Sequence, residues 1–540
     1  MAAASGRGFP GPMSCATDPS EGIREITMSL LRAITTVGGY TLLSRVAGFV
    51  RDIIIARYLG AGAVADAFFV AFRFPNLFRS LFAEGAFSAA FVPLFAGEVE
   101  AQGRDAARRF AREAYTVLAL LLVVFVAAME ILMPWAMIAL APGFADVPGK
   151  MTLAVELSRI AFPYLLFISL ASLQSGVLNS LGHFAAAAAA PILLNLTLIT
   201  ALLGFADSAP TPGHALAWGV SAAGVLQFVW LAVHCRRAGL PLGLTRPRLS
   251  PLVRRLGRRV VPVVFGSSLY QVNLLIGTVL ASLVSDGAVS YLYYADRVTQ
   301  LPLGVIGIAV GTALLPLLSR QLKAGNIEAA LWNQNRALEV ALLLTLPAAA
   351  ALMVLATPIT ATLFERGAFS PEDTVATAAA MVAFGAGLPA FVLVKVLTPA
   401  FYAREDTATP VRIAAVAMAT NIGLNVALMG PLGHIGIAIG ASASSWLNAV
   451  LLAVVLHRRR LFSPDARLGT RLPRIVAAVA GMGALLWGVM DLLEPLSAHG
   501  DLTRIPALIV LIAAGGLGYG GLVLLLRATS LADLKTALRR

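Results

Sequence analysis

The fold of this chain is decided by residues 44–98, which read SRVAGFVRDIIIARYLGAGAVADAFFVAFRFPNLFRSLFAEGAFSAAFVPLFAGE. Two apolar stretches flank a short glycine-rich turn at residues 60–63. Each stretch is long enough to cross a bilayer as a helix, which takes about 20 residues. Both nevertheless carry arginine and acidic residues inside the apolar run. A charge at membrane depth costs about 2.5 kcal/mol or more, so such residues usually face a wet cavity or a partner and serve a function there.

The composition places the 540-residue chain among helical membrane proteins. It is 58% hydrophobic and only 13% charged, whereas about a quarter of the residues in a soluble domain are charged. Two cysteines, Cys15 and Cys235, imply no disulfide framework. The six histidines are scattered, and no GK[ST] follows the glycine-rich turn. The sequence therefore predicts a protein that is not an enzyme, with no cofactor and no metal site.

The apolar stretches predict an all-α polytopic membrane protein with about fourteen spanning helices. We expect these at 33–59, 64–96, 109–141, 152–180, 184–205, 214–234, 260–284, 288–319, 329–364, 374–402, 409–429, 435–456, 475–493 and 504–526. Polar and basic segments divide the chain into a disordered tail (1–27), an N-lobe (28–235), a basic linker (236–259), a C-lobe (260–457), a second basic linker (458–474), two last spans (475–527) and a tail (528–540). Met28 is an alternative start to Met1.

The cations gather in the links that follow even-numbered spans. Eight arginines lie in residues 236–259 and six in residues 458–474, whereas the opposite links are poor in cations. By the positive-inside rule, both termini are expected in the cytoplasm. This orientation signal accounts for the basic links, so no nucleic-acid binding is predicted, while contact with anionic lipid headgroups stays open.

An internal repeat relates the two lobes. The motif FVPLF at 91–95 corresponds to LLPLL at 314–318, an offset of 223 residues. Pro163 matches Pro389 and Asn195 matches Asn421, both at an offset of 226. Such parallel repeats are familiar in transporters, which place their site between the two halves. The repeat therefore predicts two six-helix lobes in the same orientation, followed by two further spans.

Four arginines inside the predicted spans are candidate ligands for an anionic substrate. The intramembrane cations outnumber nearby anions, and the arginine fork donates two parallel hydrogen bonds to a phosphate. These candidates are Arg45, Arg51, Arg79 and Arg297. Internal pairing that merely locks the lobes is the alternative, and it is the preferred role for Asp52, Asp296 and Glu84. Supporting positions are Asn76, three residues before Arg79, and Lys395. Arg57 and Arg73 are expected to snorkel toward the membrane surface.

Several motifs resemble those of the MurJ/MviN family of lipid II flippases, over essentially the whole chain from Met28. Besides residues 44–98, they are APGF at 141–144, YYADR at 293–297, the run GxxGIAxGTxLLPxLS from residue 304 and FYAREDTATPV at 401–411. The resemblance implies a V-shaped cavity between two lobes in a bacterial inner-membrane protein. It implies transport of undecaprenyl-diphosphate-linked disaccharide-pentapeptide to the periplasmic face for peptidoglycan synthesis. It also assigns functional roles to the four arginines, with Asp66 as their acidic partner, and a lipid-tail groove to the last two spans.

The resemblance has departures and leaves partners open. The family often has an acid where this chain has Gln300, and some members bind sodium through acids in the second lobe. Spans seven and eleven here offer Gln271, Asn273, Asn421 and Asn425 without a carboxylate, which does not favour a sodium site. We expect a monomer in contact with membrane lipids, with cell-wall synthesis proteins as partners left open.

Two other functions compete with lipid II transport. One is export of another lipid-linked oligosaccharide, or of drugs, by the same superfamily. A drug or cation exporter needs an anionic site, whereas this one is cationic. The other is a non-transporting scaffold for cell-wall enzymes, which would need no arginines at membrane depth.

Overall fold

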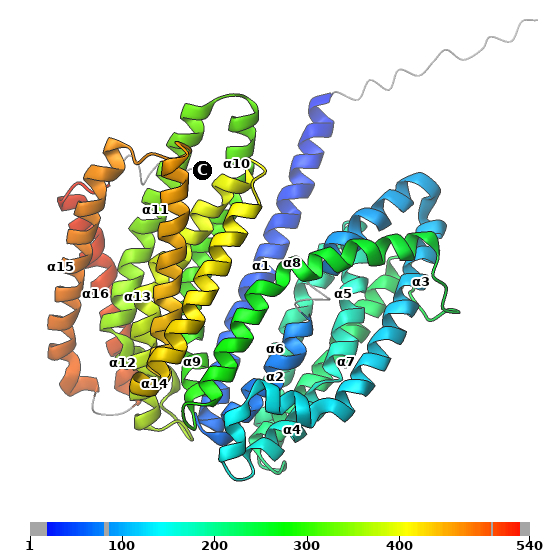
Figure 1. Cartoon of the computed structure of the whole chain (residues 1–540), viewed down its shortest axis with the longest axis horizontal. Helices are drawn as coiled ribbons and strands as arrows, with labels where there is room; N and C mark the ends of the chain where they lie inside the picture. Colours follow the sequence, from blue (N-terminus) through cyan, green and yellow to red (C-terminus); the bar gives the residue numbers. More distant parts are fainter. Residues whose placement is uncertain (1–18, 80–85, 498–500, 530–540) are drawn as a thin grey trace, which may run out of the picture.

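The structure is a computed structural model, which describes residues 19–79, 86–497 and 501–529 (Figure 1). These residues form helices and connecting turns, and no β-strand occurs among them. The predicted fold class, an all-α bundle of spanning helices in two lobes with an added C-terminal pair, is confirmed.

The N-lobe contains the first six predicted spans. Its elements are α1 (Pro19–Leu59), α2 (Ala63–Arg79), α3 (Ala86–Leu140), η2 (Pro142–Asp146), α4 (Lys150–Ala161), α5 (Tyr164–Ser180), α6 (Phe184–Phe205) and α7 (Pro212–Arg237). Helix α3 holds the end of span two and all of span three, because Gly103 adopts non-helical angles (φ 84°, ψ 177°) and breaks it. Pro163 interrupts span four between α4 and α5.

The C-lobe and the C-terminal pair follow the same plan. Their elements are α8 (Pro251–Ser282), α9 (Ala288–Pro302), η3 (Leu303–Gly307), α10 (Ile308–Lys323), α11 (Ile327–Val354), α12 (Ala356–Phe364), α13 (Pro371–Tyr402), α14 (Ala408–Arg458), α15 (Ala466–Ser497) and α16 (Asp501–Leu525). Span eight is α9, η3 and α10 in series, and η3 is a π-helical turn. Gly433, with φ 58°, divides α14 into spans eleven and twelve.

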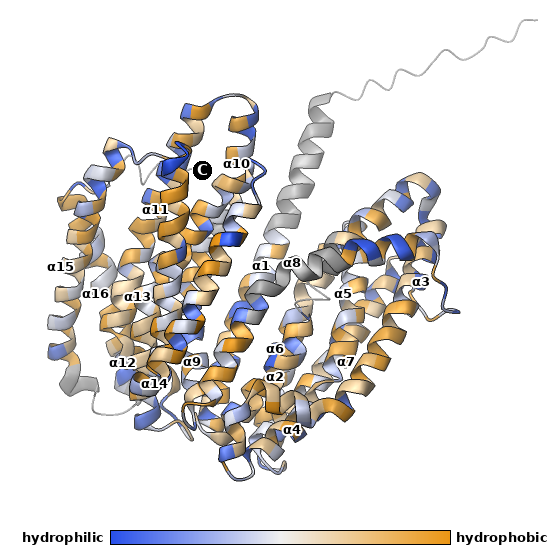
Figure 2. Cartoon of the chain, viewed as in Figure 1, coloured by the Kyte–Doolittle hydropathy of each residue, from blue (hydrophilic) through white to orange (hydrophobic). Residues whose placement is uncertain are grey.

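Apolar side chains cover the outside of the bundle, as a lipid environment requires. Within the described part of the chain, nine helices are long and apolar enough to cross a membrane. Large hydrophobic residues such as Val124, Ile131 and Leu517 are exposed on α3 and α16. Figure 2 shows apolar colour along the helix sides and hydrophilic colour at helix ends and in the first turns of α8. The sides of the helix bundle are therefore suited to contact with lipid.

The two lobes touch at one end, which we call the contact end, and their helices diverge toward the other, the separated end (Figure 1). At the contact end, the amide of Ala368 donates to the carbonyl of Arg57 at 2.8 Å. Gly60 (φ +63°) and Gly367 (φ +63°) flank this junction, and a Cβ on either would collide with backbone of the other lobe. Glycine is needed here both for its backbone angles and for the close approach.

At three places a helix begins earlier in the chain than the predicted span does. Helix α1 begins at Pro19, so residues 19–27 are helical rather than part of a disordered tail, while residues 1–18 lie outside the described residues. Both basic linkers are shorter than predicted, since α8 begins at Pro251 and α15 at Ala466. In the first turns of α8, Val253 and Leu256 are buried three residues apart and belong to the largest hydrophobic cluster of the described residues. The start of α15 is capped, because the carboxylate of Asp465 accepts the amide of Leu468 at 2.7 Å.

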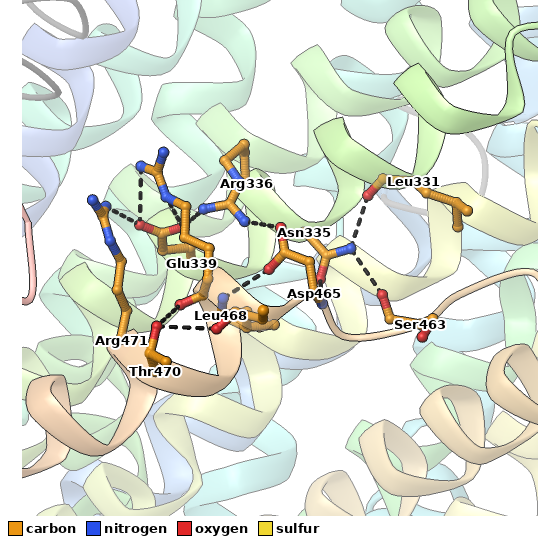
Figure 3. Close-up of polar contacts among 11 residues, drawn as sticks. Leu331, Asn335, Arg336, Glu339, Ser463, Asp465, Leu468, Thr470 and Arg471 are labelled. Carbon is orange, nitrogen blue, oxygen red and sulfur yellow. Dashed lines mark hydrogen bonds and ion pairs between the residues drawn. The ribbon is translucent and has the colours of Figure 1, made fainter.

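A polar cluster at the separated end fixes the C-terminal pair to the C-lobe (Figure 3). We call it the Glu339 cluster. Glu339 of α11 is 5% exposed and pairs with three arginines. They are Arg336 of the same helix, Arg467 at 3.3 Å and Arg471 at 2.5 Å, both of α15. Arg336 also binds Asp465. At the contact end, Arg504 of α16 pairs with Glu365 at 3.0 Å. Both ends of the pair are thus tied to the C-lobe.

Candidate functional site

The core of the site is a buried ion pair on α1. Arg51 is 6% exposed and Asp52 is 2% exposed. The Arg51 guanidinium donates to Asp52 Oδ1 from Nε and Nη2 at 3.0 and 2.7 Å, and from Nη1 to Asn195 Oδ1 of α6 at 2.9 Å. Asn195 in turn donates to the Ser44 carbonyl at 3.0 Å. Arg51 is therefore held by residues of its own lobe in this conformation.

Asp52 also binds the other lobe. Arg297 Nε of α9 lies 3.3 Å from Asp52 Oδ2, and the Tyr293 hydroxyl donates to Oδ1 at 3.1 Å. The Arg297 guanidinium lies 4.8 Å from the centre of the Tyr293 ring, which stacks on Phe69 of α2. The Arg297 side chain remains 38% exposed. Two arginines share one carboxylate across the lobes, so this Asp52 cluster keeps one positive charge in excess.

Arg45 and Lys395 form a second cationic point, on the π-helical turn η3. Both residues are exposed. The Arg45 guanidinium of α1 sits against Gly304, and Lys395 of α13 against Gly307. Both cations therefore lie against the same five-residue turn. Arg45 lies seven residues before Asp52, a step of about 10 Å along α1. This point therefore lies about two helical turns closer to the start of α1 than the Asp52 cluster does.

The other predicted site residues fall in separate places. Arg79 Nε donates to Asn76 Oδ1 at 2.7 Å, so the expected pairing at the end of α2 is present. Asp296 accepts a hydrogen bond from Gln300 at 2.9 Å. Glu84 lies outside the described residues. Nothing in the described contacts joins Arg79 to Arg297.

A polar cavity of about 200 Å³ lies between Arg73 of α2 and the C-lobe helices α8, α9, α13 and α14. Its polar lining consists of Arg73, Asn273, Thr278, Tyr293, Asp296, Gln300, Asn421 and Asn425. Arg73 points into it from α2 and donates to the Thr278 hydroxyl, so the prediction that it snorkels is wrong. Asn421 donates to Asn273 at 2.8 Å. Among the described residues, no group of three histidines, cysteines or acids is placed to hold a metal.

Asp66 takes part in the contact end instead of the arginine clusters. It is fully buried at the start of α2 and accepts four hydrogen bonds. Three come from the first turn of α9, namely the Gly287 amide, the Ser290 amide and the Ser290 hydroxyl at 2.8, 2.8 and 2.6 Å. The fourth comes from Lys150 at 2.8 Å. A carboxylate at a helix N-terminus satisfies free amides and complements the helix dipole. Asp66 thus caps a C-lobe helix from the N-lobe.

Lys150, Asn195 and Tyr293 were not among the residues predicted for the site. Lys150 also pairs with Asp286 at 2.5 Å and lies 4.2 Å from the Phe144 ring centre. Its signal in the sequence was weak, since it is a single cation in a link of low charge. Asn195 was visible through its repeat partner Asn421, and Tyr293 through the YYADR motif, but neither signal gave a contact.

Comparison with known proteins agrees with this architecture. The family model described as "Lipid II flippase MurJ" matches residues 55–506. A probable lipid II flippase MurJ of Rhizobium meliloti (strain 1021) is 48% identical over 522 residues, covering 95% of this chain and 97% of its own. The lipid II flippase MurJ of Burkholderia cenocepacia is 41% identical over 444 residues, covering 81% and 86%.

Solved structures show the same fold. A structure titled as lipid II flippase MurJ in an inward closed conformation aligns with a TM-score of 0.75 at 23% identity, over 93% of this chain and 99% of its own. An inward-facing multidrug resistance MATE family transporter of the MOP superfamily aligns at 0.64 and 15% identity, over 79% and 98%. At these identities the likeness concerns the fold alone. The family model and the sequence relatives decide the family: this chain belongs to the MurJ family of lipid II flippases.

Proposed function

We propose that this chain moves lipid II, an undecaprenyl-diphosphate-linked disaccharide-pentapeptide, from the cytoplasmic to the periplasmic face of a bacterial inner membrane. The observation that carries the proposal is the cationic junction between the lobes. Arg51 and Arg297 share the single carboxylate of Asp52. Arg45 and Lys395 meet on η3. An excess of positive charge on facing helices, inside an apolar protein, suits a substrate whose headgroup is anionic.

The residues divide into ligands and supports. We assign Arg45, Arg79 and Arg297 to the diphosphate, because a guanidinium binds phosphate oxygens with two parallel hydrogen bonds. Arg51 joins them when the Asp52 cluster rearranges, and until then it holds Asp52 in place. A cationic drug would meet repulsion at this junction, so drug export is the less favoured function. Export of another lipid-linked oligosaccharide would use the same charges, and no contact in the structure favours it.

Transport is proposed to follow alternating access. The basic links suggest that the separated end faces the cytoplasm, with both termini, and that the contact end faces the periplasm. The headgroup would enter from the separated end while the lipid tail stays in the bilayer. The Asp66 cap and its partner Lys150 would then release, which opens the contact end. Moving one uncompensated charge across 100 mV is worth about 2.3 kcal/mol, and an inside-negative potential favours outward movement of an anion.

A flipping assay tests the function directly. The full chain is reconstituted in liposomes with fluorescent lipid II, and loss of inner-leaflet label is followed with and without an imposed potential. We expect lipid II to move, and labelled phosphatidylcholine to stay. Equal movement of both lipids, or of neither, would contradict the proposal. A periplasm-specific reporter fused near Gly213 should be active and one near Leu244 silent. The reverse pattern would invert the proposed direction.

A further inference from the structure

The π-helical turn η3 is the one described break in span eight, and two cations from different lobes lie against it. Turns of this kind widen a helix by one residue and occur often at functional sites. Gly304 and Gly307 both lie within this five-residue turn. The Arg45 guanidinium of the N-lobe lies at Gly304, and the Lys395 side chain of the C-lobe lies at Gly307.

Both glycines leave room for a charged side chain. An added Cβ at Gly304 would collide with Arg45 Nη1, and one at Gly307 would come within 3.0 Å of Lys395 Cδ and 3.6 Å of Nζ. In each case the obstacle is a flexible side chain rather than backbone. A methyl group at either position would therefore displace the cation and leave the helix intact.

Two cations held side by side without a carboxylate have an unfavourable charge balance. No ion pair or hydrogen bond of the Arg45 or Lys395 side-chain nitrogens occurs among the described contacts, which include the Asp52 cluster two turns away. Both are cations that lie against one five-residue turn, and like charges at such close quarters repel each other. A polyvalent anion between them would relieve this repulsion, and the fork of Arg45 and the point charge of Lys395 both suit phosphate oxygens.

We propose that Arg45, Lys395 and the turn 303–307 form a phosphate-binding subsite that assembles only when both lobes contribute, with Gly304 and Gly307 as positioning residues. The inference rests on the proposed function and specifies its first contact. Because Arg45 precedes Asp52 by about 10 Å along α1, the subsite is nearer the separated end. The lipid-borne diphosphate reaches it before the Asp52 cluster, where one carboxylate opposes anions.

A double-mutant cycle tests this in the full-length protein in detergent. The probe is farnesyl diphosphate, with farnesol and inorganic pyrophosphate as comparison ligands, and the readouts are its dissociation constant and the thermal midpoint. Arg45→Ala and Gly304→Ala should each weaken farnesyl diphosphate binding at least tenfold. When Arg45 is already alanine, Gly304→Ala should raise the dissociation constant by less than a further twofold, because the glycine acts through the guanidinium that is then absent. The matched control is Gly423→Ala, where a Cβ meets nothing within 4 Å.

One further variant acts on the other cation. Gly307→Ala should weaken binding through Lys395. Weaker binding of both farnesyl diphosphate and pyrophosphate, with farnesol binding unchanged, would place the effect on the phosphate groups and support the subsite. Tighter binding of pyrophosphate than of farnesyl diphosphate by the parent would assign the subsite to free phosphate, which overturns its role as a lipid contact.

The outcomes separate this inference from the function itself. If Arg45→Ala weakens binding while Gly304→Ala and Gly307→Ala bind as the parent, the subsite model is wrong and the anion site stands. If the effects of Gly304→Ala and Arg45→Ala simply add, the glycine acts through the fold and not through Arg45. If Arg45→Ala and Arg297→Ala both bind as the parent, the proposed function has failed.

Discussion

The Asp52 cluster and the Glu339 cluster use the same chemistry for opposite purposes. Each places arginines around a buried carboxylate and keeps one positive charge in excess. The Glu339 cluster gathers Arg336 of α11, Arg467 and Arg471 of α15 and Asp465, the residue before α15, and both helices lie on the C-lobe side of the molecule (Figure 1). In the Asp52 cluster, Arg51 belongs to the N-lobe and Arg297 to the C-lobe.

The difference lies in which contacts a transport cycle has to break. Relative movement of the lobes leaves the Glu339 cluster intact, because all its members move with the C-lobe. The same movement separates Asp52 from Arg297. A buried ion pair that never opens contributes to the folded state alone, whereas one that crosses the lobes also sets the balance between conformations. Burial and charge are similar in the two clusters, so position in the fold decides their role.

The largest effect is expected for Arg297→Ala. It removes the C-lobe cation of the Asp52 cluster and leaves Asp52 with Arg51 alone. Loss of one member of a charged contact typically costs about 2–5 kcal/mol, so lipid II binding should weaken well over tenfold. Complementation of a flippase-depleted strain should fail at normal membrane levels. Arg297→Lys keeps the charge without the fork and should restore function only in part.

The control for this variant is Arg320→Ala, which removes an exposed arginine at the end of α10. It should bind lipid II and complement as the parent does. The functional distinction between the two clusters would be contradicted if the Arg297→Ala protein were depleted from the membrane but still bound lipid II with the parent's affinity. That result would make the Asp52 cluster a structural lock like the Glu339 cluster.

A smaller effect on transport is expected for Lys150→Met at the contact end. The lysine neutralises Asp66 and Asp286, and its own side chain is only 2% exposed. Its loss leaves two carboxylates near each other, although the first turn of α9 still binds Asp66. The closed junction should therefore open more often. Opening can be measured as the rate at which a membrane-impermeant maleimide labels a cysteine introduced by Ala61→Cys, at a position that is buried here. The two native cysteines are removed by Cys15→Ser and Cys235→Ser.

We expect labelling to become about tenfold faster with Lys150→Met, and flipping to slow severalfold. Lys323→Met removes an exposed lysine at the separated end and should change neither rate. Unchanged labelling in Lys150→Met would show that the cap of α9 by Asp66 holds the contact end without help from the lysine.

The sequence predicted the helices far better than the contacts between them. Apolar length alone located the spans, because every spanning helix must satisfy its own backbone in lipid. Asp52 and Arg297 lie 245 residues apart, and no local pattern shows that they meet. The repeat made Asn195 and Asn421 equivalent positions of the two lobes, yet Asn195 binds Arg51 while Asn421 binds Asn273. Asp66 was given a role only through a resemblance, and its partner Lys150 was missed because tertiary packing decides that contact.

Transport should barely respond to Glu339→Gln, although stability should. The change leaves three arginines around a neutral amide, and breaking a buried ion pair commonly costs about 3–5 kcal/mol. The thermal midpoint in detergent should fall by several degrees, while the affinity of the surviving folded protein for lipid II stays within twofold. A clear loss of affinity at unchanged stability would mean that α15 and α16 communicate with the site.

The smallest effect is expected for Asp406→Asn, in the link between α13 and α14. Asp406 accepts from the Thr409 hydroxyl and amide at 2.7 and 3.0 Å and pairs with Arg459 at 2.7 Å. The Thr409 hydrogen bonds, with help from Arg459, lower the pKa of Asp406 to about 2. Because the folded pKa lies below the ordinary value of 3.8, its stabilisation is present above about pH 4 and disappears as pH falls toward 2. Thermal midpoints of parent and variant should therefore differ slightly at pH 6 and converge on acidification, with flipping unchanged. This contact lies outside the lobe interface and at the surface of the bundle, so its loss should affect transport least. A flipping defect in Asp406→Asn would show that position relative to the lobes does not decide the role of a polar cluster.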